Sequence, residues 1–129
     1  WHILSAEPGA KIAAGFRESV SREGMRAAAE SGEIEQLLAW YDACPGDTFF
    51  IPAGTVHAIG AGVSLIEVQQ NSDITYRVYD WDRVDAAGRA RDLHIERALE
   101  VTRFEGTRGP HPPRTHPCRP RTSSCRRFR

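Results

Sequence analysis

GDTFFIPAGTVH at residues 46–57 is the stretch that decides the fold, together with LIEVQQ at 65–70 and YRVYDW at 76–81. Short apolar runs rich in aromatic and β-branched residues, separated by glycine-containing turns, are typical of β-strands. Pro-Ala-Gly at 52–54 interrupts the first run, so the chain must bend there before it reaches His57. We therefore predict two or three short strands, with a hairpin that carries His57 near its tip.

The rest of the body continues this β pattern with little helix. The predicted strands cover residues 1–4, 11–16, 49–51, 63–70 and 75–80. Residues 94–100 read as a short helix.

Residues 20–42 differ from their surroundings and predict a helical insertion. Ser19 or Ser21 can cap a helix over residues 23–30 that holds the alanine run 27–29, and Ser31 can cap a second helix. In that second helix Trp40 and its neighbours recur at helical spacing, so we expect this aromatic stripe to pack against the sheet.

The two ends of the chain differ in charge. The net charge of zero combines a balance of −7 over residues 1–102 with +7 over 103–129. Residues 106–129 hold five of the eight prolines and almost no large apolar side chain, so we predict a disordered, basic, Pro/Arg-rich tail. Charge alone could attract nucleic acid, but the tail lacks interleaved aromatic residues, which argues against a nucleic-acid partner.

Length and composition favour one cytoplasmic domain. The 129 residues suit a single domain, and no apolar run reaches the length of a membrane span. Three cysteines without paired spacing argue against a disulfide framework and for a reducing compartment. The chain begins at Trp1 rather than Met, which suggests a processed piece or a fragment.

The spacing Gly-x5-Pro-x-Gly-x2-His at residues 46–57 resembles the second sequence motif of the cupins, small antiparallel β-barrels that hold a metal ion. Followed by 65–70 and 75–81, it resembles type I mannose-6-phosphate isomerase over roughly residues 1–105. The resemblance implies a mainly β fold, a jelly-roll-like partial cupin domain over residues 1–105 with the helical insertion at about 20–42.

The resemblance also implies an activity and a cofactor. The family interconverts mannose 6-phosphate and fructose 6-phosphate with zinc, and His57 matches one of its four zinc ligands. The other three come from Gln-x-His and Lys-x-Glu motifs, which this sequence does not contain. The family pattern places Lys-x-Glu just ahead of Trp1, so we expect a fragment that is inactive alone.

Arg77 and Glu67 are the candidate catalytic residues. On a strand, Arg77 would point into a pocket or, at the surface, pair with Asp80 or Asp82. Glu67 stands among apolar residues, where a carboxylate is costly unless it is paired, for example with Arg77. By resemblance, Arg77 would stabilise the charge on the enediol oxygens, and Glu67 would be an acid/base candidate for moving the proton.

Lys11 is the candidate substrate-binding residue, with an exposed lysine at a strand end as the plainer alternative. His94 has no partner at a meaningful spacing, and we expect it to be exposed. Two other functions remain open beside the zinc-dependent isomerase. One is a cupin that binds sugar without catalysis after losing its metal, and the other is nucleic-acid binding through the tail.

Overall fold

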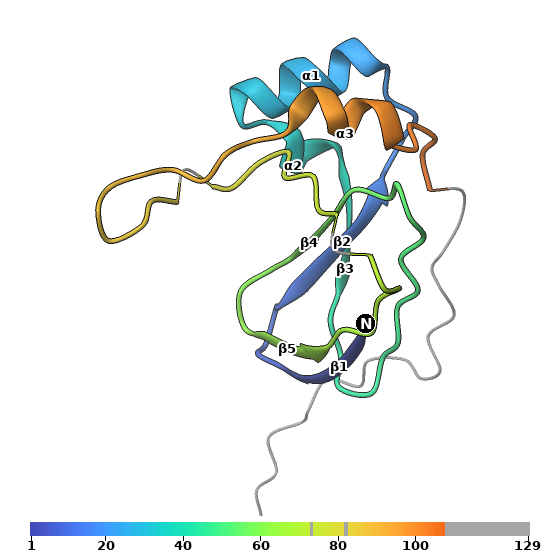
Figure 1. The fold of residues 1–129 in the computed structure, drawn as a ribbon. Helices are drawn as coiled ribbons and strands as arrows, with labels where there is room; N and C mark the ends of the chain where they lie inside the picture. Colours follow the sequence, from blue (N-terminus) through green and yellow to red (C-terminus); the bar gives the residue numbers. More distant parts are fainter. Residues whose placement is uncertain (73, 82, 108–129) are drawn as a thin grey trace, which may run out of the picture.

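The computed structural model describes residues 1–107 except 73 and 82, and this part of the chain is mainly β with few helices (Figure 1). Its elements are β1 (His2–Ala6), β2 (Lys11–Phe16), α1 (Arg22–Ser31), α2 (Ile34–Leu37), β3 (Leu38–Asp42), β4 (His57–Ile59), β5 (Val63–Ile66) and α3 (Ile95–Val101). The predicted fold class is confirmed.

The strands form two antiparallel sheets. One sheet has three strands in the order β3-β2-β4, and the other pairs β1 with β5. In the first, Ala13 of β2 lies opposite Trp40 of β3 on one side and Ala58 of β4 on the other. The central strand β2 therefore fixes where β4, which carries His57, begins.

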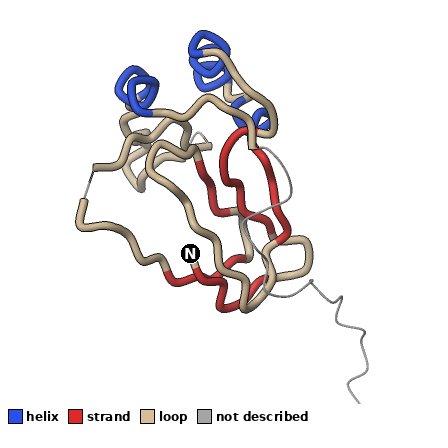
Figure 2. The backbone as a smooth tube through the Cα atoms, turned by 90° about the vertical axis from the view of Figure 1, so that its right-hand side faces the viewer, coloured by secondary structure: helices blue, strands red, loops and turns tan. Residues whose placement is uncertain are grey.

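The helices gather at one end of the sheets (Figures 1 and 2). Helix α1 begins at Ser21, whose hydroxyl accepts a hydrogen bond from Gly24 N at 3.0 Å, and ends at Gly32 with φ 79°. Helix α3 packs beside α1, where Arg26 Nε and Nη2 donate to the two Glu96 carboxylate oxygens at 2.7 and 2.8 Å.

Two hydrophobic clusters hold these layers together. Beneath the helices lie Ala13, Phe16, Met25, Ala28, Ala29, Ile34, Leu38, Ala58 and Leu99. Between the sheets lie Ile3, Ile12, Ala43 and Phe49. Because β2 contributes to both clusters, its burial is nearly complete from Ile12 to Phe16.

The predicted strands at 1–4 and 11–16 and the helix at 94–100 are confirmed within a few residues by β1, β2 and α3. The second helix is shorter than predicted. It ends at Leu37, and Trp40 lies in β3 because its backbone pairs with β2. The helical spacing of the aromatic residues was therefore misleading.

The predicted hairpin around His57 is wrong. Strand β4 pairs with β2, and β5 pairs with β1, so the two successive strands belong to different sheets. Residues 49–51 are not a strand, although Phe49 is buried and its backbone N donates to Trp1 O at 2.8 Å.

Two more predicted strands need correction. Strand β5 ends at Ile66, so Glu67 lies beyond it, and residues 75–80 form no strand. Around Trp81 the backbone turns, with φ 51° and a hydrogen bond from Arg83 N to Asp80 O at 3.0 Å. This turn follows the predicted strand, and the backbone already bends within it, at Val78.

Cys44, the one cysteine among the described residues, is buried. The predicted tail lies outside the described residues from position 108 onward.

Candidate functional site

His57 is placed by the Pro-Ala-Gly turn that precedes β4. Thr55 N donates to Pro52 O at 3.1 Å, and Gly54 adopts φ 79°, the conformation that a type II turn requires at this position. His57 then begins β4 opposite Ala14 of β2. The glycine and proline of the motif thus serve to turn the chain so that the histidine enters the sheet edge.

The imidazole of His57 has a defined tautomer. Its Nδ1 lies 2.8 Å from Thr55 O, and a carbonyl oxygen can only accept, so Nδ1 carries the proton. The Nε2 lone pair is consequently available, in the arrangement by which a backbone carbonyl orients many metal-binding histidines. The exposed ring also meets Trp1 edge-on, with 5.2 Å between ring centroids.

The described residues do not complete a metal centre. Among residues 1–107 without 73 and 82, no group of three or more His, Cys, Asp or Glu side chains is arranged to hold a metal ion. His57 therefore has the donor chemistry of one ligand, whereas a zinc site usually takes at least three from the protein.

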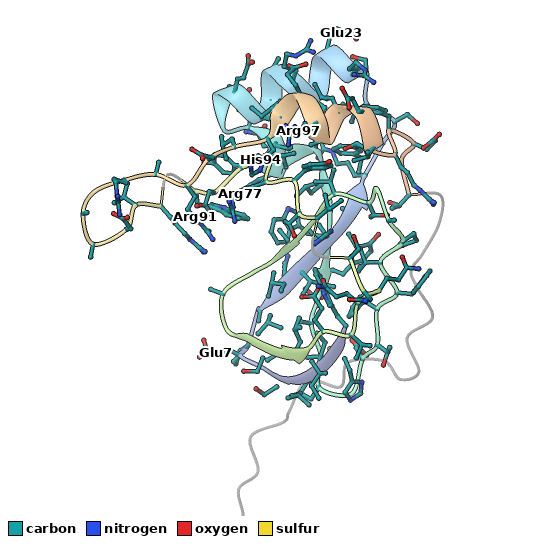
Figure 3. All side chains as sticks on the ribbon, viewed as in Figure 1. Glu7, Glu23, Arg77, Arg91, His94 and Arg97 are labelled. Atoms are coloured by element: carbon teal, nitrogen blue, oxygen red, sulfur yellow. The ribbon has the colours of Figure 1, made fainter. Side chains whose placement is uncertain are left out.

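Arg77 is half-buried and is held by the segment that leads into α3. Its backbone N donates to His94 Nδ1 at 3.2 Å, and its backbone O accepts from His94 N at 2.7 Å. Its guanidinium donates through Nη1 to Asp92 O at 3.3 Å. Arg77, Arg91 and His94 gather beneath α3 in Figure 3. Instead of the predicted strand, the chain around Arg77 is an irregular segment that is hydrogen-bonded to residues 92–94.

The carboxylate next to this segment belongs to Asp80, which is 7% exposed. Arg91 donates to it twice, from Nε to Oδ2 at 2.6 Å and from Nη2 to Oδ1. These bonds hold the pKa of Asp80 below its usual value, and the charges of Arg77 and Arg83 lower it further. The surface pair expected between Arg77 and Asp80 is therefore a pair between Arg91 and Asp80.

Asp80 should make the stability of the chain depend on acidity. Because its folded-state pKa is below the ordinary value of 3.8, its contribution is complete above that pH and is lost as the pH falls further. We expect Asp80→Asn to unfold at lower urea than the wild type at pH 7, and the difference to shrink toward pH 3.

The measurement is urea unfolding across that pH range. Glu67→Gln makes the same chemical change at an exposed residue outside any strand or helix. That control should stay within about 0.5 kcal/mol of the wild type at pH 7. An Asp80→Asn chain with the wild-type pH dependence would contradict this role for the Arg91 pair.

The structure does not bring the four predicted site residues together by contact. Glu67 is exposed, and no ion pair joins it to Arg77 within the described part of the chain. Lys11 Nζ lies 3.9 Å from Asp42 Oδ1, both side chains being more than half exposed. His57 and Arg77 flank one hydrophobic cluster, since their neighbours Ala58 and Val78 both pack into it.

His94 is one of the residues that sequence reasoning missed. It is half-buried rather than exposed, and its ring meets Tyr76 with 6.3 Å between centroids. It lies 17 residues from Arg77, which is no spacing of any regular element. Only the pairing of two irregular segments could have shown the contact.

The comparisons with known proteins support one family. No protein-family model matches the sequence. Over 101 residues, 78% of the chain, it is 46% identical to mannose-6-phosphate isomerase of Streptococcus mutans and 45% identical to mannose-6-phosphate isomerase ManA of Bacillus subtilis. The chain is homologous to the mannose-6-phosphate isomerases. It spans about a third of these relatives, 32% of each.

The fold agrees with this relationship. A crystal structure of the mannose 6-phosphate isomerase from Bacillus subtilis matches 84% of this chain with a TM-score of 0.76 and 38% identity, and the match covers 34% of that protein. This structural likeness confirms the resemblance seen in the sequence. Among the described residues no helix is long and apolar enough to cross a membrane.

Proposed function

We propose that this chain forms part of a zinc-dependent mannose-6-phosphate isomerase, which interconverts mannose 6-phosphate and fructose 6-phosphate. The observation that carries the proposal is the identity of 40–46% over 101 residues to four proteins, two named as mannose-6-phosphate isomerases and two as probable or putative ones. A cytoplasmic location and a sugar-phosphate substrate belong to the same proposal.

His57 is proposed as one zinc ligand. Its Nδ1–H donates to Thr55 O, so Nε2 is free to bind the ion. The other ligands would come from regions of the isomerases that the match to this chain does not cover. When bound, zinc would polarise the sugar oxygens.

Arg77 is proposed as the fixed cation of the reaction. Moving a proton between C1 and C2 of the sugar passes through an enediolate, whose oxygens carry negative charge. A guanidinium already held by Asp92 O does not need to reorganise when that charge develops. Asp80 is occupied by Arg91, which leaves the Arg77 charge available for an anion.

Glu67 and Lys11 are proposed with supporting roles. Glu67, exposed just beyond β5, would carry the proton between the carbons. Lys11 would contact the substrate phosphate. Its pair with Asp42 spans 3.9 Å between exposed side chains, and such pairs contribute little, so a phosphate could displace the carboxylate.

A cupin that binds sugar without catalysis is the second candidate. One observation favours it for this chain, namely that the described residues offer no group of three metal ligands. Zinc content and turnover in an assembled protein separate the two functions.

The experiment is a chimera in which residues 1–105 replace the homologous segment of the Bacillus subtilis isomerase. The chimera should interconvert the two sugar phosphates. In it, Arg77→Ala should keep zinc and lower kcat about a hundredfold, with a smaller rise in KM, because the charge that Arg77 meets grows in the transition state.

Arg89→Ala is the matched control for Arg77→Ala. Arg89 is exposed and pairs with Asp85 within its own loop, so its loss should leave kcat and KM near the parent values. If Arg77→Ala and Arg89→Ala behave alike, Arg77 has no part in the reaction.

A further inference from the structure

His94 holds Arg77 through the polypeptide backbone. The two residues exchange a reciprocal pair of hydrogen bonds, from Arg77 N to His94 Nδ1 at 3.2 Å and from His94 N to Arg77 O at 2.7 Å. Two residues earlier, Asp92 O accepts from the Arg77 guanidinium at 3.3 Å. The segment 92–94 thus fixes Arg77 at both its backbone and its charged end.

The chemistry of these bonds fixes the state of the His94 ring. A backbone N–H can only donate, so His94 Nδ1 must be unprotonated and the proton of the neutral ring lies on Nε2. This tautomer is opposite to that of His57, whose Nδ1 donates to a carbonyl. Without an acceptor at Nδ1, the N–H of the half-buried Arg77 would lose its partner, which is costly.

His94 is itself anchored by the helical layer. Its backbone O accepts from Ala98 N at 2.9 Å and so caps the first turn of α3. Helix α3 is fixed by the fully buried Leu99 and by the two bonds between Glu96 and Arg26 of α1. The Tyr76 ring lies beside the His94 ring, with 6.3 Å between their centroids. The contact between His94 and Arg77 is therefore anchored by α3, which is itself packed into the fold.

We propose that His94 is a positioning residue: through Nδ1 it sets the backbone of Arg77 and thereby the place at which the guanidinium meets an anionic sugar oxygen. This inference rests on the proposed role of Arg77 in the isomerase. It assigns to His94 no contact with substrate. The essential feature is the hydrogen-bond acceptor at Nδ1, not the imidazole ring as a whole.

Three substitutions separate the acceptor from the bulk of the ring. His94→Asn keeps an oxygen near the place of Nδ1, His94→Gln moves the polar group toward the place of Nε2, and His94→Leu removes the acceptor while keeping apolar volume. A role in packing alone predicts the same result for Asn and Gln.

The experiment is nuclear magnetic resonance on the full 129-residue chain. In the wild type, the ring ¹⁵N shifts of His94 should show protonated Nε2, and a coupling should cross the hydrogen bond from Arg77 N to His94 Nδ1. Exchange of the Arg77 amide should be about tenfold faster in His94→Leu and in His94→Gln, the effect of one lost hydrogen bond, and near wild type in His94→Asn.

Titration with mannose 6-phosphate then tests the link to binding. The Arg77 side-chain Nε–Hε resonance should shift in the wild type and in His94→Asn, and at least about threefold less in His94→Leu at the same ligand concentration. A protonated Nδ1 in the wild type, or equal Arg77 exchange in all three variants, would overturn the inference. If exchange follows the acceptor but no variant responds to mannose 6-phosphate, the positioning of Arg77 by His94 stands and the proposed sugar-phosphate function fails for this chain.

Discussion

Gly54→Ala should lower the free energy of unfolding by about 2–5 kcal/mol, because a left-handed backbone penalty and a steric clash act together. Gly54 has φ 79°, and a Cβ at this position would lie 2.4 Å from the backbone carbonyl oxygen of Val101. The turn cannot easily move away from Val101, because Gly54 O accepts a hydrogen bond from Arg103 N at 2.8 Å. The glycine of the motif is therefore explained by its close approach to the end of α3.

Gly88→Ala is the matched control for this change. Gly88 has φ 76°, but nothing lies within 4 Å of an added Cβ. Gly88→Ala should lower the free energy of unfolding by about 1–2 kcal/mol, the backbone penalty alone. Urea unfolding of the full chain measures both variants, and equal losses would contradict the account of the Gly54 turn.

His57→Ala should have the largest effect on the reaction. In the chimera with the Bacillus subtilis isomerase, we expect turnover to fall about a thousandfold or more, since the charge stabilisation that a metal gives a transition state is worth several kcal/mol. His57 is exposed, and among the described residues its ring makes one hydrogen bond, to Thr55 O, so the variant should still fold.

His2→Ala tests whether the loss of any exposed histidine would lower turnover as much as His57→Ala. His2 lies in β1, in the sheet that does not contain His57, and its Nδ1 lies 3.0 Å from Thr48 Oγ1. We expect His2→Ala to keep nearly full turnover. Equal losses at the two positions would mean that the His57 effect is not one of metal binding.

The elements that could be predicted are those fixed by local signals. Strand β2 is a short apolar run, and α1 has a serine cap and an alanine run, so both follow from neighbouring residues. The pairing of β4 with β2 and of β5 with β1 could not be predicted, because each contact joins segments more than 40 residues apart. Trp40 shows the same limit, since pairing with β2 overrides its helical spacing.

The residues of the candidate site likewise fall into those that the local sequence predicts and those that it does not. His57 could be recognised because the turn that positions it lies within the preceding five residues. The predicted position of Glu67 within a strand was wrong because β5 ends at Ile66. Arg91 and His94 were missed because they contact Asp80 and Arg77 through an irregular loop, which has no periodicity to read.

The most direct test of the central claim, that His57 belongs to the zinc centre of an isomerase, is the zinc bound per chain in the purified chimera. The account predicts about one zinc per chimera chain and per His2→Ala chain, and almost none in a folded His57→Ala chain. A His57→Ala chimera that keeps full zinc would contradict it.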